Sequence, residues 1–332
     1  MKETSIKKRE KKKVEESALL RGMKEVAKGK TCTTIKRHWG LYLMLLPAFV
    51  LVAIFCYAPM FGIVIAFEDF TLAKGIFESE FVGMKNFKQI FFADTLGTYR
   101  VFRNTIYISI IRIATNFPVI LLFTLLVNEI GNRKAKSLVQ TISYIPHFVS
   151  WIAVGGMAYN LLSVDGGLLN QILGWFGVEP IVWYSENDYW WAILAISSLW
   201  KGMGWATLIY ISALGSIDAE LYDACEIDGG GRIRKALSVT LPGLMNVIAL
   251  QLILDVGSIM GDNYIQIMAM TNSSQSLSES TSVVGSLTFK ALTGAGGYSK
   301  ASAYGLIQSV IGMGLVLLTN RIISKTDSEG VL

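Results

Sequence analysis

The chain has few charged residues, few cysteines and few histidines. These shortages argue, in that order, against a soluble domain, a disulfide-linked fold and a metal site. Charged side chains make up 17% of the 332 residues, whereas a soluble domain usually carries about 25%. Three widely spaced cysteines cannot form a disulfide framework. The two histidines, His38 and His147, have no companion at ligand spacing, so we expect no metal site. The remaining composition, 52% hydrophobic, indicates a polytopic membrane protein.

Six apolar stretches are long enough to cross the ~30 Å hydrocarbon core, which needs about 20 helical residues. They cover residues 39–66, 104–127, 139–162, 189–214, 241–260 and 301–323. The fifth is the weakest by hydropathy because it contains Asp255. We therefore predict an all-α integral membrane fold with six transmembrane helices.

The first 37 residues differ from the rest in charge, with 13 Lys or Arg against 5 Glu. A basic run ahead of a first membrane helix holds that end in the cytoplasm, so we expect no nucleic-acid partner. Residues 14–28 read as an amphipathic helix attracted to anionic lipid of the inner leaflet. A partly disordered tail is the alternative.

The loops between the spans differ in charge, which predicts their sides of the membrane. Residues 128–138, 215–240 and the segment after the sixth span contain Lys and Arg, whereas residues 163–188 contain neither. Basic loops stay in the cytoplasm. We therefore expect both termini and the 215–240 loop to face the cytoplasm.

A polar loop interrupts the apolar pattern between the fourth and fifth spans. Residues 220–227 can form about two helical turns, in which the small side chains of Ala224 and Cys225 allow a partner to approach closely. Asp228 and Gly229 predict the end of that helix, because glycine accepts the left-handed conformation. Arg232 begins the next helix.

This loop, followed by Leu241-Pro242, resembles the "EAA" loop of ATP-binding-cassette (ABC) importer permeases. It departs from the family pattern where Asp223-Ala224-Cys225 stands for Glu-Ala-Ala and Gly230 for Ala. Further strings resemble permeases of carbohydrate importers, in particular those for complex oligosaccharides. These strings are Phe81–Phe87, Asn104-Thr105, Pro146–Trp151 and Gly202–Trp205.

The resemblance implies a type I (MetI-like) importer permease that works by alternating access. It divides the chain into a tail (1–37), a first span with an outer segment (38–103), a core permease domain (104–325) with the docking loop 220–242, and a second tail (326–332). The implied partners are a second, related permease in a heterodimer, two ATPase subunits and an extracellular substrate-binding lipoprotein in a bacterial plasma membrane. ATP and Mg would bind to the ATPase subunits, so this chain has no cofactor and no catalytic residue. The residues that would dock the ATPase are Glu220, Asp223, Ala224, Cys225, Asp228, Gly229 and Arg232.

A sugar pathway would combine aromatic faces with planar polar groups. An ionisable residue within a span is a functional candidate, which favours Asp255 and Arg112, whose side chains could also pair. Aromatic residues that anchor the membrane interface and polar residues that join helices are the structural alternatives. The candidates are Arg112, Trp151, Asn160, Trp200, Trp205, Gln251, Asp255, Asn263 and Tyr264.

Three other functions stay open at this point. An importer of the same architecture could carry an amino acid, peptide or phosphate, although the outer segment and the aromatic candidates favour sugar. A stand-alone secondary transporter would show inverted repeats or matching broken helices, and would leave the docking loop unexplained. A membrane-embedded enzyme would need a larger cluster of ionisable groups at membrane depth.

Overall fold

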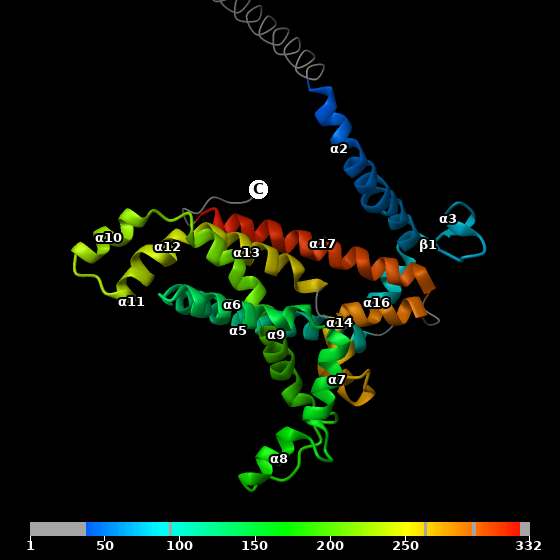
Figure 1. The fold of residues 1–332 in the computed structure, drawn as a ribbon. Coiled ribbons are helices and arrows are strands. Elements are labelled where there is room, and N and C mark those ends of the chain that lie inside the picture. The colour runs from blue at the N-terminus through cyan, green and yellow to red at the C-terminus, as the bar shows by residue number, and fades with distance from the viewer. Residues whose placement is uncertain (1–37, 93–94, 262–263, 294–296, 326–332) are drawn as a thin grey trace, which may run out of the picture. The chain divides into compact units, whose positions relative to one another are not determined.

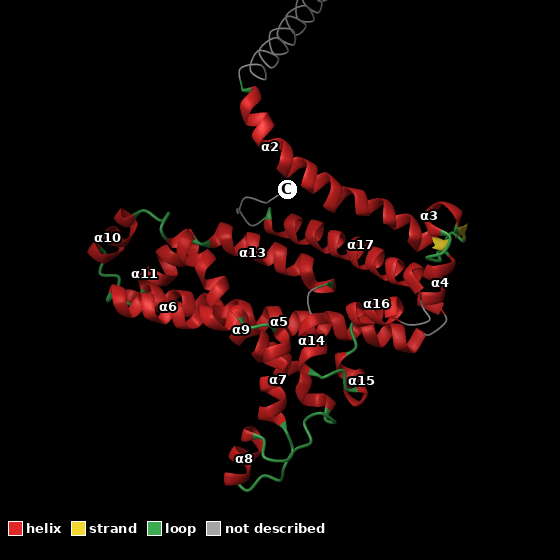
Figure 2. Cartoon of the chain, turned by 45° about the vertical axis from the view of Figure 1, so that its right-hand side comes forward, coloured by secondary structure: helices red, strands yellow, loops and turns green. Residues whose placement is uncertain are grey.

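The computed structural model describes residues 38–92, 95–261, 264–293 and 297–325 (Figure 1). The expected amphipathic helix, Cys32, Asn263 and the second tail lie outside these residues. The chain divides into two compact units, the first ending at Gly62 and the second beginning at Ile63. Figure 2 shows that most of the described chain is helical.

The elements follow one another in the order α2 (Trp39–Val52), η1 (Ala53–Tyr57), η2 (Ala58–Phe67), β1 (Glu68–Asp69), α3 (Gly75–Glu78), β2 (Glu80–Phe81), α4 (Lys85–Phe92), α5 (Thr95–Asn128), α6 (Arg133–Phe148), α7 (Trp151–Leu162), α8 (Leu168–Trp175), η3 (Asn187–Tyr189), α9 (Trp190–Leu214), α10 (Ala219–Ile227), α11 (Arg232–Lys235), η4 (Ala236–Thr240), α12 (Leu241–Gly243), α13 (Met245–Gly257), η5 (Ser258–Met260), α14 (Tyr264–Met270), η6 (Gln275–Leu277), α15 (Ser278–Thr281), α16 (Val284–Thr293) and α17 (Gly297–Ile323). The strands β1 and β2 pair antiparallel, with Glu68 opposite Phe81.

Four helical segments among the described residues are long and apolar enough to cross a membrane, and they match the first, second, fourth and sixth predicted spans. These are Trp39–Phe67, Gly97–Asn128, Asn187–Leu214 and Gly297–Ile323. No residue of α2 in the first unit is buried, and its sequence is apolar on every side, which suits a helix surrounded by lipid. The predicted all-α membrane architecture is confirmed.

The third and fifth spans differ from the continuous helices predicted. The fifth bends by 62° between Arg232–Gly243 and Met245–Met260. At the third predicted span, the structure has two separate helices, α6 and α7, because Val149 and Ser150 have extended backbones. Of these, Trp151–Leu162 is apolar but shorter than a membrane span. Ser150 caps α7 by accepting a hydrogen bond from the Ala153 backbone N–H at 3.2 Å, the usual role of serine at a helix start. Apolar length alone did not reveal this break.

Helices of the second unit pack most closely where glycine lies between them. The main pairs are α5 with α9, α6 with α9, α7 with α14, and both α13 and α16 with α17. A Cβ atom at Gly204 of α9 would lie 2.1 Å from the Ser143 carbonyl oxygen of α6. One at Gly155 of α7 would lie 2.2 Å from the Ala269 oxygen of α14. Small residues therefore let these helix backbones approach, as is common within membranes.

Buried polar side chains join segments that are distant in sequence. The Asn104 side-chain amide, which is fully buried, donates to the Glu279 and Ser282 carbonyl oxygens at 2.8 and 3.2 Å. Asn86 donates to the Ala66 and Glu68 carbonyl oxygens at 2.9 and 3.0 Å. These two asparagines, which contributed to the resemblance, thus satisfy backbone groups that would be costly to leave unpaired.

Candidate functional site

The docking loop folds as α10, a tight turn and α11, as the sequence predicted. Asp218 begins α10, because its side-chain oxygen accepts from the Glu220 N–H at 3.0 Å. At the other end the Gly229 N–H donates to the Glu226 oxygen at 2.9 Å, and the Gly230 N–H donates to the Cys225 oxygen at 2.8 Å. This pair of bonds is a Schellman motif. Gly229 has φ +78°, which confirms the predicted helix stop.

The turn needs its glycines for different reasons. Gly229 supplies the left-handed conformation, whereas a Cβ atom at Gly230 would lie 2.6 Å from the Cys225 carbonyl oxygen. Gly231 is extended and has open space around its Cβ position. The turn therefore tolerates a side chain at Gly231 but not at Gly230.

An ion pair joins the two short helices. Lys235 Nζ lies 2.5 Å from Glu226 Oε2. The hydrogen bond lowers the pKa of the Glu226 carboxyl and raises the pKa of the Lys235 amine. Arg232 Nε lies 3.7 Å from Glu129 Oε2, and its side chain is 85% exposed. Most of the Arg232 side chain is therefore available to a partner.

The predicted docking residues form an exposed surface. All except the half-buried Cys225 are exposed. Sequence reasoning missed Ile227 and Ile233, which flank the turn and are 86% and 78% exposed. Large apolar side chains that are exposed together mark interaction sites. In both overall views α10 and α11 lie together at one extremity of the second unit, and α8 lies at another (Figures 1 and 2).

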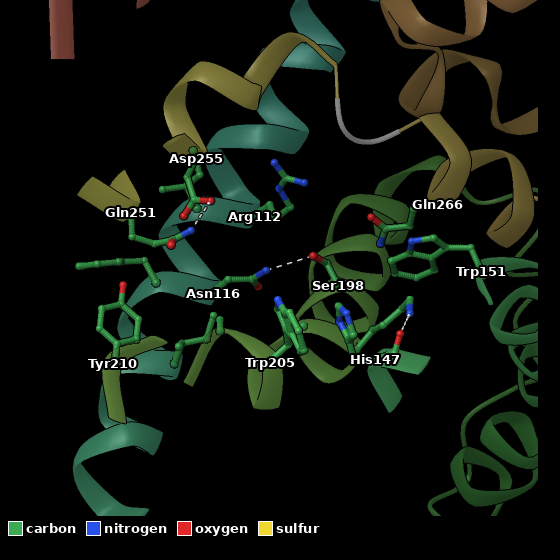
Figure 3. A pocket seen from close by; sticks show the side chains of 16 residues that line it. Arg112, Asn116, His147, Trp151, Ser198, Trp205, Tyr210, Gln251, Asp255 and Gln266 are labelled. Carbon is green, nitrogen blue, oxygen red and sulfur yellow. Dashed lines mark hydrogen bonds between the residues drawn. The ribbon is translucent and has the colours of Figure 1, made fainter. Parts of the chain in front are cut away.

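A cavity of about 410 Å³ lies among the helices of the second unit (Figure 3). Its lining comes from α5, α6, α7, α9, α13 and α14. Residues on one helix recur at intervals of three or four, as in Ser198, Lys201 and Trp205, because such residues share a helix face. The polar and aromatic lining consists of Arg112, Asn116, His147, Trp151, Ser198, Lys201, Trp205, Tyr210, Gln251, Asp255 and Gln266.

Aromatic rings and one ammonium group form part of the wall. The rings of His147 and Trp205 are stacked, with centroids 4.6 Å apart and 6° between their planes. Lys201 Nζ lies 5.5 Å from the centre of the Trp151 ring, within the range of a cation–π interaction. This wall therefore offers both flat apolar faces and a positive charge.

Planar and charged polar groups form the rest of the lining. The Gln251 amide donates to Asp255 at 3.2 Å, and the Asn116 amide donates to Ser198 at 3.0 Å (Figure 3). Arg112 Nη2 donates to the Ser258 hydroxyl at 3.3 Å. Amides, hydroxyls and a carboxylate beside aromatic faces are the groups that a polyhydroxylated ligand can use.

Five of the nine predicted pathway residues line this cavity, and three do not. Asn160 is exposed on α7, nine residues or about 13 Å along the helix from Trp151. Trp200 is on another face of α9, where it lines an apolar pocket with residues of α7 and α8. Tyr264 packs against Phe289 with ring centroids 5.4 Å apart. The five are Arg112, Trp151, Trp205, Gln251 and Asp255.

Six polar or aromatic lining residues were not predicted. His147 lies within the string 146–151, and Lys201 directly precedes the string 202–205. The resemblance therefore pointed to these segments but not to the role of either residue. The others required knowledge of how α5, α9 and α14 face one another. The six are Asn116, His147, Ser198, Lys201, Tyr210 and Gln266.

Comparison with known proteins identifies the family. Residues 90–324 match the family "Binding-protein-dependent transport system inner membrane component". The chain belongs to this family. It is an ABC-type permease, a transport subunit of the membrane.

Relatives and solved structures align over most of the chain. "Polygalacturonan/rhamnogalacturonan transport system permease protein YteP" of Bacillus subtilis is 35% identical, covering 88% of this chain and 89% of the relative. "Protein LplB" of the same organism is 36% identical, covering 90% and 92%. A bacterial ABC transporter involved in the import of the acidic polysaccharide alginate has a TM-score of 0.79 and 28% identity, covering 90% of this chain and all of that one. A second alginate transporter structure, in complex with an alginate pentasaccharide-bound periplasmic protein, has a TM-score of 0.80.

Proposed function

We propose that this chain is a permease subunit of an importer that moves an oligosaccharide across a bacterial plasma membrane by alternating access. The observation that carries the proposal is the 410 Å³ cavity, in which stacked aromatic rings adjoin amide, hydroxyl and carboxylate groups. Aromatic faces cover the C–H surfaces of sugar rings, and planar polar groups bind hydroxyls. The names of the relatives, which refer to polysaccharide transport, support the same substrate class.

The docking loop is where this chain would receive the motion of two ATPase subunits. Short helices held by a Schellman turn and an ion pair form a compact, exposed element. The exposed Ile227 and Ile233 can enter a partner surface, and the flanking charges can bind polar groups around it. ATP and Mg bind to those subunits, and this loop with both termini faces the cytoplasm.

Membership of the family supports proposals for the remaining partners. A second, related permease forms the other half of the pathway in a heterodimer, and an extracellular lipoprotein delivers the sugar. The periplasmic protein in the alginate transporter complex supports a binding-protein partner. Asp255, Gln251, Trp151, Trp205 and Arg112 contact the sugar.

The test is affinity purification of the tagged chain from native membranes, with bound proteins identified by mass spectrometry. Gly229→Asp adds a charge at a residue with φ +78°, whereas Gly231→Asp adds the same charge where the backbone is extended and open. We expect an ATPase, a second permease and a binding lipoprotein with the wild type and with Gly231→Asp, and loss of the ATPase with Gly229→Asp. Equal retention in both variants contradicts the docking role, and a chain that purifies alone contradicts the importer.

A further inference from the structure

Lys201 is a cation at the break in the third span. Its Nζ donates to the His147 carbonyl oxygen at 2.5 Å and to the Pro146 carbonyl oxygen at 3.4 Å. These oxygens belong to the last turn of α6, where carbonyl groups lack the usual partner four residues on, although the Pro146 oxygen also accepts from the Val149 N–H at 3.2 Å. The close approach at Gly204, one turn further along α9, brings Lys201 to this position.

The ammonium group retains binding capacity in this position. A lysine side chain has three N–H donors, and two carbonyl oxygens occupy two of them. Lys201 forms no ion pair with any carboxylate of the described residues. Its side chain is half-buried and lines the cavity. One donor of the ammonium group therefore remains for a ligand.

The charges of the cavity do not balance. Arg112 and Lys201 are its two basic residues, and Asp255 is the one carboxylate among its lining residues in the described chain. Asp255 forms no ion pair with Lys201, so in the described chain the Lys201 ammonium group has no carboxylate beside it in the cavity. Because a charge within a membrane protein is costly without a counter-charge, an anionic ligand that supplies one gains affinity.

We propose that the cavity selects acidic oligosaccharides and that Lys201 binds a carboxylate of the sugar while the Trp151 and Trp205 rings cover its apolar faces. This inference rests on the proposed function and deepens it by naming the substrate class. Lys201 is then a specificity-determining residue as well as a cap of α6.

Two substitutions separate the charge of Lys201 from its capping role. Lys201→Gln keeps N–H donors for the α6 carbonyl groups and removes the charge. Lys201→Arg keeps both the donors and the charge. A residue that served only as a cap would tolerate both changes without altering substrate preference.

The experiment measures uptake into proteoliposomes that contain the complete importer with its binding protein. The probes are trigalacturonate, its fully methyl-esterified form and maltotriose. The acid-to-ester ratio is compared between variants, because the same binding protein contributes equally to each. We expect the wild type and Lys201→Arg to prefer the acid. Lys201→Gln should lower the ratio about tenfold, equivalent to about 1.4 kcal/mol.

Several outcomes overturn the inference while the proposed function stands. They are an unchanged ratio in Lys201→Gln, a wild type without preference for the acid, uptake of maltotriose alone, and loss of all uptake in Lys201→Gln with normal uptake in Lys201→Arg. If the assembled wild type hydrolyses ATP but takes up none of the three probes, the carbohydrate function itself fails. A smaller amount of folded variant does not change the ratio, since both probes are measured on one preparation.

Discussion

Replacing Gly204 by alanine should force α6 and α9 apart and displace Lys201. The new Cβ atom would lie 2.1 Å from the Ser143 carbonyl oxygen, so the backbones must separate by about 1.3 Å to reach an ordinary contact of 3.4 Å. The same movement pulls Lys201 away from the His147 carbonyl oxygen and disrupts the 2.5 Å hydrogen bond between them.

These two effects are larger than the opposing gain in helix propensity. Overpacking costs about 1–3 kcal/mol, and a lost hydrogen bond to a charged group costs about 1.5–3 kcal/mol. Against these costs, the higher helix propensity of alanine stabilises the helix by about 1 kcal/mol relative to glycine. We expect a net destabilisation of about 2 kcal/mol or more. At about 2.1 cal/mol/K of unfolding entropy per residue, this corresponds in a chain of 332 residues to a decrease in melting temperature of about 3 °C or more.

Thermal unfolding of the detergent-solubilised protein, followed by tryptophan fluorescence, measures this decrease. Gly202→Ala is the matched control, because it is on the same helix and a Cβ atom there has no neighbour within 4 Å. Its melting temperature should be unchanged or slightly higher. Equal melting temperatures for the two variants would refute the close packing of α6 on α9.

Two further predictions concern the cavity and the docking loop. Trp205→Ala should lower the initial rate of oligosaccharide uptake about tenfold. Trp200→Ala is the control, because Trp200 is similarly exposed (43% against 47%) but faces the apolar pocket, and it should change the rate less than about twofold. Equal losses would contradict the placement of Trp205 in the substrate pathway. The Glu226–Lys235 pair should contribute the same stability to the α10–α11 turn from about pH 5 to 9. The pKa of Glu226 is lowered, so its carboxylate stays charged until the pH falls below this window. The pKa of Lys235 is raised, so its ammonium group stays charged until the pH rises above this window. The rate of amide hydrogen exchange in the α10–α11 turn, corrected for the intrinsic rate, should therefore be independent of pH within this window in the wild type. It should be faster in Glu226→Gln. A pH-dependent corrected rate in the wild type within the window would contradict the role of the pair.

The docking loop was predictable because its conformation is set by residues adjacent in sequence. Gly229 ends α10 through its own backbone freedom, and the acceptors of the turn lie within five residues. Four spans were predictable for a similar reason, since twenty apolar residues suffice to cross a membrane whatever their neighbours. The break at Ser150 is also local, but the apolar residues around it concealed the cap.

The cavity was predictable only in part. Asp255 and Arg112 were identified because ionisable residues within a span are rare, and Trp151 and Trp205 because they are aromatic at membrane depth. Trp200 has the same residue type and the same depth, yet it faces α7 and α8. A helix turns by about 100° per residue, so one step along α9 separates Trp200 from the cavity residue Lys201.

The sequence by itself determined the membrane class, the order of the spans, the family and the local form of the docking loop, because these depend on composition and on short-range backbone chemistry. The tertiary structure alone decided which side chains share the cavity. That outcome depends on helix rotation and on close approaches such as Gly204 against Ser143. It places Lys201 of α9 on the carbonyl groups of α6, a contact between residues more than fifty positions apart that no periodicity in either helix encodes.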